Sequence, residues 1–201
     1  MDLAVIAITF GAIFIVELPD KTFIAALVLS TRYKPFAVWI GVGLAFALQT
    51  LVAVTAGALA TLLPDTLIKS VAIAIFLLGA FLLFRTAPGA DVAEREQEEE
   101  YAAKAGEPKS FLKAVVASFL VLFAAEWGDL SQLLTISFVT RYHDHVSVFI
   151  GAWAALLTVS GLAILAGRVL LRYLKLSLLH YIGACVCLLL AAVTLFEVVR
   201  G

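Results

Sequence analysis

The sequence predicts an all-α integral membrane protein with six transmembrane helices, arranged as two inverted three-helix repeats around a site at the membrane midplane. Three observations predict this fold class: the composition, the length of the apolar segments, and an internal repeat of polar residues. Apolar residues make up 63% of the chain and charged residues only 14%, whereas soluble domains are roughly half apolar and about a quarter charged. Such a chain could not cover its apolar surface in water, so we expect lipid around it.

Long apolar segments give the expected spans. Each is near or above the ~20 residues that a helix needs to cross the hydrocarbon, and several are long enough to tilt or to break inside the membrane. Short connections with turn-forming residues, such as Pro64-Asp65, separate most of them. The segments are residues 3–30, 36–63, 67–84, 111–139, 146–171 and 177–199.

One polar stretch divides the chain into two halves. Residues 88–109 include the acidic run 94–100, and we expect a solvated acidic linker that can be part helical. The first repeat is then 1–87 and the second is 110–201, within one membrane domain. Ten Lys and Arg residues gather on the linker side and three on the other side. By the positive-inside rule the linker is cytoplasmic and both termini face outward.

Rare polar residues recur at one offset, which indicates an internal repeat. Segments 17–22 (Glu-Leu-Pro-Asp-Lys-Thr) and 126–131 (Glu-Trp-Gly-Asp-Leu-Ser) place Glu, Asp and a hydroxyl residue 109 positions apart. Segments 31–33 and 140–142, both Thr-Arg-Tyr, share this offset. Because three spans change the side from which the chain enters, the two halves have opposite orientations. Transporters with such inverted repeats bind their substrate at the midplane between the halves.

The two Glu-x-x-Asp motifs form the candidate site. Each ionised group at membrane depth costs about 2.5–3.5 kcal/mol, so these acids must be paired, protonated or bound to a cation. A spacing of three residues puts Glu and Asp one turn apart on the same helix face. Clustered oxygen atoms suit a hard divalent cation such as Ca²⁺ or Mn²⁺. The predicted metal-site residues are Glu17, Asp20, Glu126, Asp129, Thr22, Ser131 and Gln132.

Two residues are expected to break the helices at these motifs. Pro19 removes a backbone donor and Gly128 permits the same distortion, and both changes free backbone carbonyls for a cation. Lys21 is either a counter-ion of the empty site or a side chain that extends to the interface; a single lysine cannot neutralise four acids. Other polar residues could complete the coordination, although hydroxyls in membrane helices usually bond their own helix: Gln49, Thr50, Thr158 and Ser160.

The predicted site suggests a transport mechanism. Crowded carboxylates in a low-dielectric site hold protons when no metal is present, so that metal binding would expel them. The leading hypothesis is therefore a divalent-cation/proton antiporter, without catalytic residues or a resident cofactor. Its expected partners are divalent cations, protons and membrane lipids, and a homodimer is possible. A net charge of −1 and the lack of a recognition motif exclude a nucleic-acid binder.

Two other function classes remain open. An intramembrane lipid phosphatase also uses inverted repeats and acidic motifs, but it needs a basic group on the phosphate. Here every Arg lies near the end of a span, and Lys21 alone is central. A passive cation channel is the other alternative, and lack of proton coupling would favour it.

The paired motifs resemble the Glu-x-Gly-Asp-Lys/Arg-Thr/Ser signature of the Gdt1/TMEM165 family, also called uncharacterised protein family 0016. The resemblance covers the whole chain and implies secondary transport of Mn²⁺ and Ca²⁺ in exchange for protons, with the motif acids as ligands. For a bacterial member it implies manganese export across the plasma (inner) membrane. The chain departs from the signature at three positions, namely Pro19 for glycine, Leu130 for the basic residue, and Phe23 where the second motif has Gln132.

Overall fold

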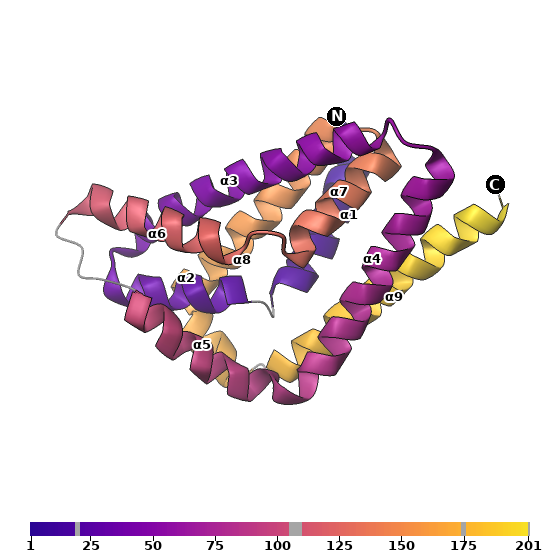
Figure 1. Cartoon of the computed structure of the whole chain (residues 1–201). Helices are drawn as coiled ribbons and strands as arrows, with labels where there is room; N and C mark the ends of the chain where they lie inside the picture. The colour runs from indigo at the N-terminus through magenta and orange to yellow at the C-terminus, as the bar shows by residue number, and fades with distance from the viewer. Residues whose placement is uncertain (19–20, 105–109, 174–175, 201) are drawn as a thin grey trace.

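A computed structural model of the protein describes residues 1–18, 21–104, 110–173 and 176–200, and these ranges are mostly helical (Figure 1). Helices α3, α4, α8 and α9 include segments long and apolar enough to cross a membrane, and the bent pairs α1/α2 and α6/α7 give two more spans if each pair crosses as a unit. The helices are α1 (Leu3–Glu17), α2 (Lys21–Arg32), α3 (Pro35–Ala60), α4 (Asp65–Thr86), the 3₁₀ turn η1 (Ala87–Gly89), α5 (Ala90–Lys104), α6 (Phe111–Ala125), α7 (Leu130–Tyr142), α8 (His145–Tyr173) and α9 (Leu176–Arg200).

The first and fourth expected spans are each divided into two helices. The axes of α1 and α2 differ by 72°, and those of α6 and α7 differ by 74°. The prediction that Glu and Asp of each motif share one helix face is therefore wrong for the second motif, where one helix ends before Glu126 and the next begins after Asp129. Gly128 explains this break, because its φ of 77° lies in the left-handed region and cannot continue a right-handed helix.

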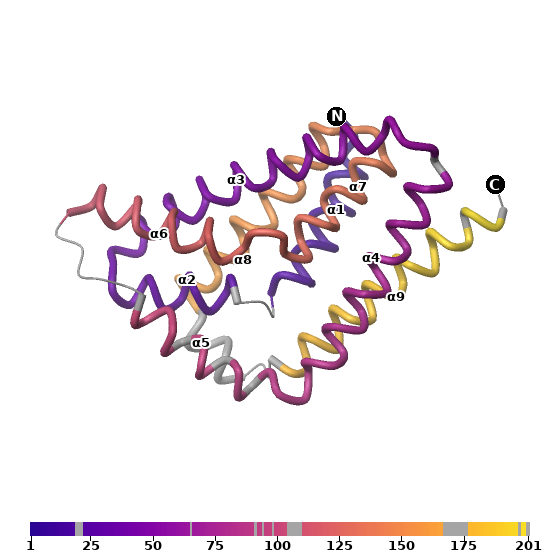
Figure 2. The backbone as a smooth tube through the Cα atoms, in the orientation of Figure 1, coloured from indigo at the N-terminus to yellow at the C-terminus, as the bar shows by residue number. Residues whose placement is uncertain are grey.

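Helices of the two halves pack across one another. Helix α1 contacts α8, and α3 contacts both α6 and α8, whereas α4 and α9 run side by side along one flank (Figure 2). Apolar side chains from both halves fill the space between these helices. Among the most deeply buried are Ile13, Phe46, Leu122, Leu134 and Phe138.

Two glycines bring helices from different halves into close contact. A Cβ on Gly41 of α3 would overlap the carbonyl oxygen of Val115 and lie 2.9 Å from the Cβ of Ser118, both on α6. A Cβ on Gly151 of α8 would lie 2.7 Å from the carbonyl oxygen of Ile6 and 2.9 Å from the Cβ of Thr9, both on α1. Small residues at helix crossings allow this approach inside membranes.

The acidic stretch is more than a solvated linker. Residues 90–104 form α5, which contacts α2 and also α9. Tyr101 and Ala90 of α5 are buried in the apolar core, with Ala102 packed against it, while Glu96, Glu99 and Glu100 are exposed. The expectation of a solvated segment therefore holds for one face of α5 and is wrong for the other, because Ala90 and Tyr101, on either side of the acidic run, are spaced so that they share one helix face.

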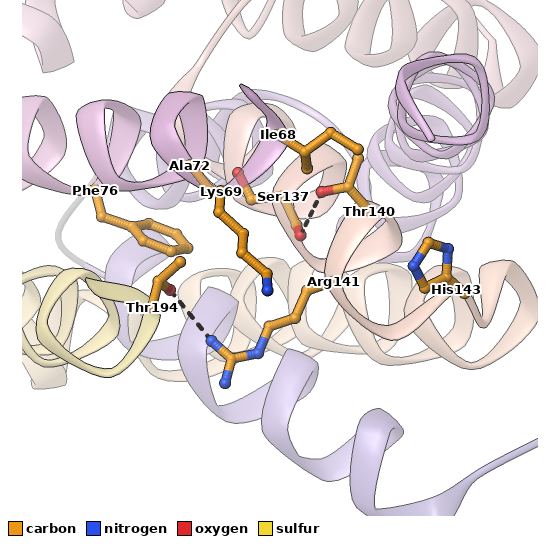
Figure 3. A pocket seen from close by; sticks show the side chains of 9 residues that line it. All are labelled: Ile68, Lys69, Ala72, Phe76, Ser137, Thr140, Arg141, His143 and Thr194. Carbon is orange, nitrogen blue, oxygen red and sulfur yellow. Dashed lines mark hydrogen bonds between the residues drawn. The ribbon is translucent and has the colours of Figure 1, made fainter. Parts of the chain in front are cut away.

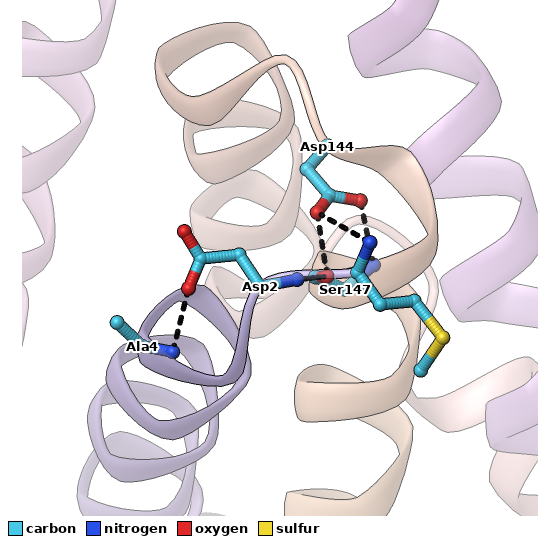
Figure 4. A network of polar contacts seen from close by, with 5 residues as sticks. Asp2, Ala4, Asp144 and Ser147 are labelled. Carbon is cyan, nitrogen blue, oxygen red and sulfur yellow. Dashed lines mark hydrogen bonds and ion pairs between the residues drawn. The ribbon is translucent and has the colours of Figure 1, made fainter.

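A polar network joins the first residues of the chain to the start of α8 (Figure 4). The Asp144 carboxylate accepts hydrogen bonds from the Ser147 hydroxyl (2.6 Å) and the Ser147 backbone N–H (3.0 Å), which caps α8. The backbone N–H of Asp2 donates to the Ser147 hydroxyl over 2.8 Å, and the Met1 amino group lies 3.8 Å from Asp144. The Ser147 hydroxyl thus connects the N-terminal ends of α1 and α8.

Candidate cation-binding site

The break between α6 and α7 positions the second motif. Helix α6 ends with Glu126 as its C-cap. Asp129 is the N-cap of α7, where its carboxylate accepts hydrogen bonds from the backbone N–H of Gln132 (2.9 Å) and from the Ser131 hydroxyl (2.8 Å). N-capping fixes the direction of a carboxylate and satisfies an N–H that the helix itself cannot. The local sequence therefore holds the two acids of this motif on either side of Gly128.

The side chain of Gln132 stabilises the same break with two hydrogen bonds to the backbone. Its amide nitrogen donates to the Glu126 carbonyl over 2.7 Å, and its amide oxygen accepts from the Gly128 N–H over 3.2 Å. Gln49 of α3 donates likewise to the Phe123 carbonyl over 3.0 Å. Side-chain amides thus occupy two backbone carbonyls near the break, and Gln132 and Gln49 support the break. Neither interaction could be read from spacing, because the partner carbonyls become available only once the helix is broken.

The first motif contributes residues of α1 and α2 to the same site. Glu17 is the last residue of α1, and Thr22 lies in the first turn of α2; both side chains are 0% exposed. The Thr22 hydroxyl has no hydrogen-bond partner among the described residues. Pro19 and Asp20, and the side chain of Lys21, lie outside the described residues, so the roles expected for them remain predictions.

Three carboxylates of the two motifs meet. Glu17, Glu126 and Asp129 each offer an oxygen, and these oxygens all lie within 4.8 Å of one another. Opposite ligands of one Ca²⁺ ion are about 4.6–5.2 Å apart, since each Ca²⁺–O distance is about 2.3–2.6 Å. One divalent cation could therefore contact all three groups. Glu17 and Glu126 are fully buried and Asp129 is half-buried, so the cluster opens toward its surroundings on the Asp129 side.

Other polar residues weighed in the sequence have different roles. The hydroxyls of Thr158 and Ser160 donate to carbonyls of their own helix, Ala154 at 2.7 Å and Leu157 at 3.1 Å, which confirms the expectation for membrane hydroxyls. Trp127, inside the second motif, is 61% exposed and lies against the Phe123 ring. Thr9 and Ser118 were not anticipated; both are fully buried, and they stand 109 positions apart.

Comparisons with known proteins show which family and which relatives this chain is similar to. A family model described as "Divalent cation/proton antiporter GDT1" matches residues 5–91 and 114–201. The GDT1-like protein sll0615 of Synechocystis is 34% identical, covering 90% of this chain and 95% of its own. A Vibrio cholerae protein named "Putative manganese exporter" is 28% identical, covering 96% of this chain and 92% of its own.

Chloroplast proteins of plants are also similar. The PAM71-homolog of Arabidopsis thaliana is 29% identical over 94% of this chain. The chain spans 58% of that protein's length and 60% of that of a rice GDT1-like protein. No solved structure matches the chain.

Proposed function

Since this chain belongs to the GDT1 family of divalent cation/proton antiporters, we propose that it exports Mn²⁺ from the cytoplasm in exchange for protons and binds Ca²⁺ at the same site. The ligands are the motif acids, with Thr22, Ser131 and Gln132 beside them. The observation that carries this proposal is the convergence of Glu17 with Glu126 and Asp129 within 4.8 Å. Oxygen ligands of this kind are preferred by Mn²⁺ and Ca²⁺.

Proton coupling follows from the crowding of these acids. Carboxylates crowded in a low dielectric repel one another, and protons would relieve this repulsion when no cation is bound. A divalent cation replaces those protons when it binds. The two occupants are therefore mutually exclusive, and a transporter that exposes the cluster to each side in turn exchanges one for the other.

Several observations support an inverted repeat. The family model matches two segments, 5–91 and 114–201, which correspond closely to the proposed halves 1–87 and 110–201. The close helix contacts are also reciprocal, because Gly41 approaches Val115 and Ser118 while Gly151 approaches Ile6 and Thr9. Val115 and Ser118 stand 109 positions after Ile6 and Thr9, and Gly151 stands 110 after Gly41. Exchanging the halves therefore reproduces the same pair of contacts.

Substrate, direction and membrane orientation belong to the same proposal. The name of the Vibrio cholerae relative supports manganese and export. The excess of Lys and Arg near α5 supports a plasma-membrane protein with this segment in the cytoplasm and both termini outside. Assembly as a homodimer is compatible with the many exposed apolar side chains, but lipid covers such a surface equally well.

The experiment is metal uptake by proteoliposomes with an imposed pH gradient. We expect gradient-driven Mn²⁺ flux in the wild type, and a loss of about tenfold or more in Glu17→Gln and Asp129→Asn, because each removes a ligand. Glu96→Gln, at an exposed position of α5, is the matched control and should transport normally. Flux that ignores the gradient would indicate a channel, and no flux of Mn²⁺ or Ca²⁺ would favour the phosphatase alternative.

A further inference from the structure

Two buried hydroxyls, one on α1 and one on α6, differ from most hydroxyls of the membrane helices. Thr9 and Ser118 are both 0% exposed, and neither hydroxyl has a hydrogen-bond partner among the described residues. Membrane hydroxyls usually donate to a carbonyl of their own helix. Thr140 does so to Ser137 over 2.9 Å, beside the cavity between α4, α7 and α9 (Figure 3). Because a buried polar group without a partner is costly, Thr9 and Ser118 need an explanation.

Helix packing explains why these two residues are small but not why they are polar. Gly151 of α8 packs against the Cβ of Thr9, and Gly41 of α3 packs against the Cβ of Ser118. Small residues are needed at such crossings, and alanine would fit both without burying a hydroxyl. The same polarity at both crossings therefore indicates a role other than packing.

A buried stripe on each helix connects the hydroxyl to an acid of the cation cluster. Residues four apart in a helix lie one above the other, so each stripe presents a hydroxyl, then an apolar side chain, then a carboxylate. The hydroxyl is about 12 Å from the acid along the helix, since each residue rises about 1.5 Å. All six side chains are at most 1% exposed. The stripes are Thr9, Ile13 and Glu17 on α1, and Ser118, Leu122 and Glu126 on α6.

The two stripes reach the cluster from opposite sides in the proposed orientation. Helix α1 begins at the N-terminus, which lies outside, and α6 follows the cytoplasmic α5 in the chain (Figure 1). Thr9 then lies on the outer side of the cluster and Ser118 on the cytoplasmic side. Ile13 and Leu122 stand between hydroxyl and acid on these two sides. Apolar constrictions stop ions by keeping water out.

We propose that Thr9 and Ser118 are the outer and inner entry points of the cation path, and that Ile13 and Leu122 are the gates between these hydroxyls and the acids. Separation of α1 from α8 lets the Thr9 hydroxyl bind the water shell of a divalent cation from outside. Separation of α6 from α3 does the same for Ser118 on the cytoplasmic side. This inference rests on the proposed exchange at the cluster and adds the route by which each side reaches it.

The first test is labelling of cysteines from each side of the membrane. Thr9→Cys and Ser118→Cys are made in the full chain with Cys185 and Cys187, the cysteines of the sequence, changed to alanine. A membrane-impermeant methanethiosulfonate reagent should label Thr9→Cys only from outside and Ser118→Cys only from the cytoplasmic side, in right-side-out and inside-out vesicles. Ala191→Cys, on α9 and 3% exposed, is the buried control and should stay unlabelled. Any other pattern at the first two positions, including labelling of neither, would overturn the proposal.

The second test compares transport with stability. Thr9→Val and Ser118→Ala remove the hydroxyls, and loss of an unpartnered buried hydroxyl is neutral or stabilising. We expect equal or higher melting temperatures together with two- to tenfold slower Mn²⁺ flux, because one hydrogen bond of the open state is lost. Thr9→Ser keeps the hydroxyl and should transport normally, as should Thr140→Val, whose hydroxyl is buried but bonded to its own helix. Normal flux in both Thr9→Val and Ser118→Ala would assign the hydroxyls to packing alone.

The gates have a test of their own. Shortening both in Ile13→Ala/Leu122→Ala should give Mn²⁺ leakage that is independent of the pH gradient. A double variant that remains folded by circular dichroism and does not leak would show that these side chains are not gates.

Failure of the proposed exchange would look different from failure of this inference. Without exchange, Mn²⁺ flux in the wild type would be absent or would ignore the pH gradient. Labelling of Thr9→Cys and Ser118→Cys from opposite sides requires neither ion. Gradient-driven flux in the wild type, combined with labelling of both cysteines from one side, would overturn the entry points alone.

Discussion

Gln132 contacts both sides of the break between α6 and α7, with hydrogen bonds to the Glu126 carbonyl and the Gly128 N–H. In Gln132→Leu these two groups lose their partners, each at a cost of about 1–3 kcal/mol where water cannot replace the bond. We expect a lower melting temperature in detergent and slower Mn²⁺ flux, since Glu126 is then held less firmly. Thr158→Val, which removes an exposed hydroxyl that bonds a carbonyl of its own helix α8, is the control. Equal melting temperatures for both variants would contradict this role of Gln132.

Asp144 is outside the helices, and its ionisation should affect stability. The Ser147 hydroxyl, followed by the Ser147 backbone N–H, lowers the pKa of Asp144 below its ordinary value of 3.8. A lowered pKa in the folded state gives a stabilisation that is complete above about pH 4 and is lost as the pH falls through the folded-state value. Asp144→Asn should therefore lower the melting temperature at pH 7 and have a smaller effect below pH 4. An effect that grows on acidification would contradict this assignment.

At the scale of helices, Gly41 sets how closely α3 approaches α6. Gly41→Ala places a methyl group against the Val115 carbonyl and should destabilise the protein by about 1–3 kcal/mol through overpacking. Gly11→Ala is the matched control, because a Cβ there meets nothing within 4 Å, and it should be neutral or stabilise by up to about 1 kcal/mol. Denaturant unfolding of both variants in detergent measures the difference. Similar stabilities would mean that α3 and α6 can separate without cost.

Docking of α5 can be tested through Tyr101, which is 5% exposed although its helix is acidic. Tyr101→Ala removes the side chain that anchors α5 in the core, so we expect faster trypsin cleavage after Arg95, which is exposed on the same helix. Glu99→Ala changes an exposed residue of α5 and should leave the cleavage rate unchanged. Cleavage of the wild type as fast as that of Tyr101→Ala would show that α5 is detached in solution.

The sequence predicted the unbroken spans well and the broken ones poorly. Helices α3, α4, α8 and α9 begin and end within a few residues of the expected segments, because long apolar runs have few alternatives in lipid. The meeting of Glu17 with the second motif was also anticipated, from the 109-residue offset. The break at Gly128 was expected only as a distortion, because a spacing of three residues fits a continuous helix equally well. The buried face of α5 was missed because seven consecutive polar residues masked its few apolar ones.

At the scale of the whole molecule, the buried carboxylates among the described residues, Glu17 and Glu126, lie where the two halves meet. Glu17 comes from the first half and Glu126 and Asp129 from the second, so the cluster exists only while the halves are in contact. In the proposed mechanism, a cation bound there would hold the halves together, whereas repulsion among the empty acids would separate them unless protons intervene. A bound cation and bound protons would therefore be alternative ways of neutralising the same carboxylates. Because these carboxylates come from both halves, this would couple cation exchange to the contact between the halves.

That exchange has a direct signature in solution, namely proton release on metal binding. Adding Mn²⁺ to the detergent-solubilised protein in weak buffer near pH 7 should acidify the medium, and the signal should saturate with occupancy of the site. Glu126→Gln should release fewer protons, because it removes one of the groups that exchange them, while Glu96→Gln should match the wild type. Metal binding without acidification would mean that the three carboxylates are already ionised when empty. The cluster could then bind Mn²⁺ without counter-transport of protons, as a channel does.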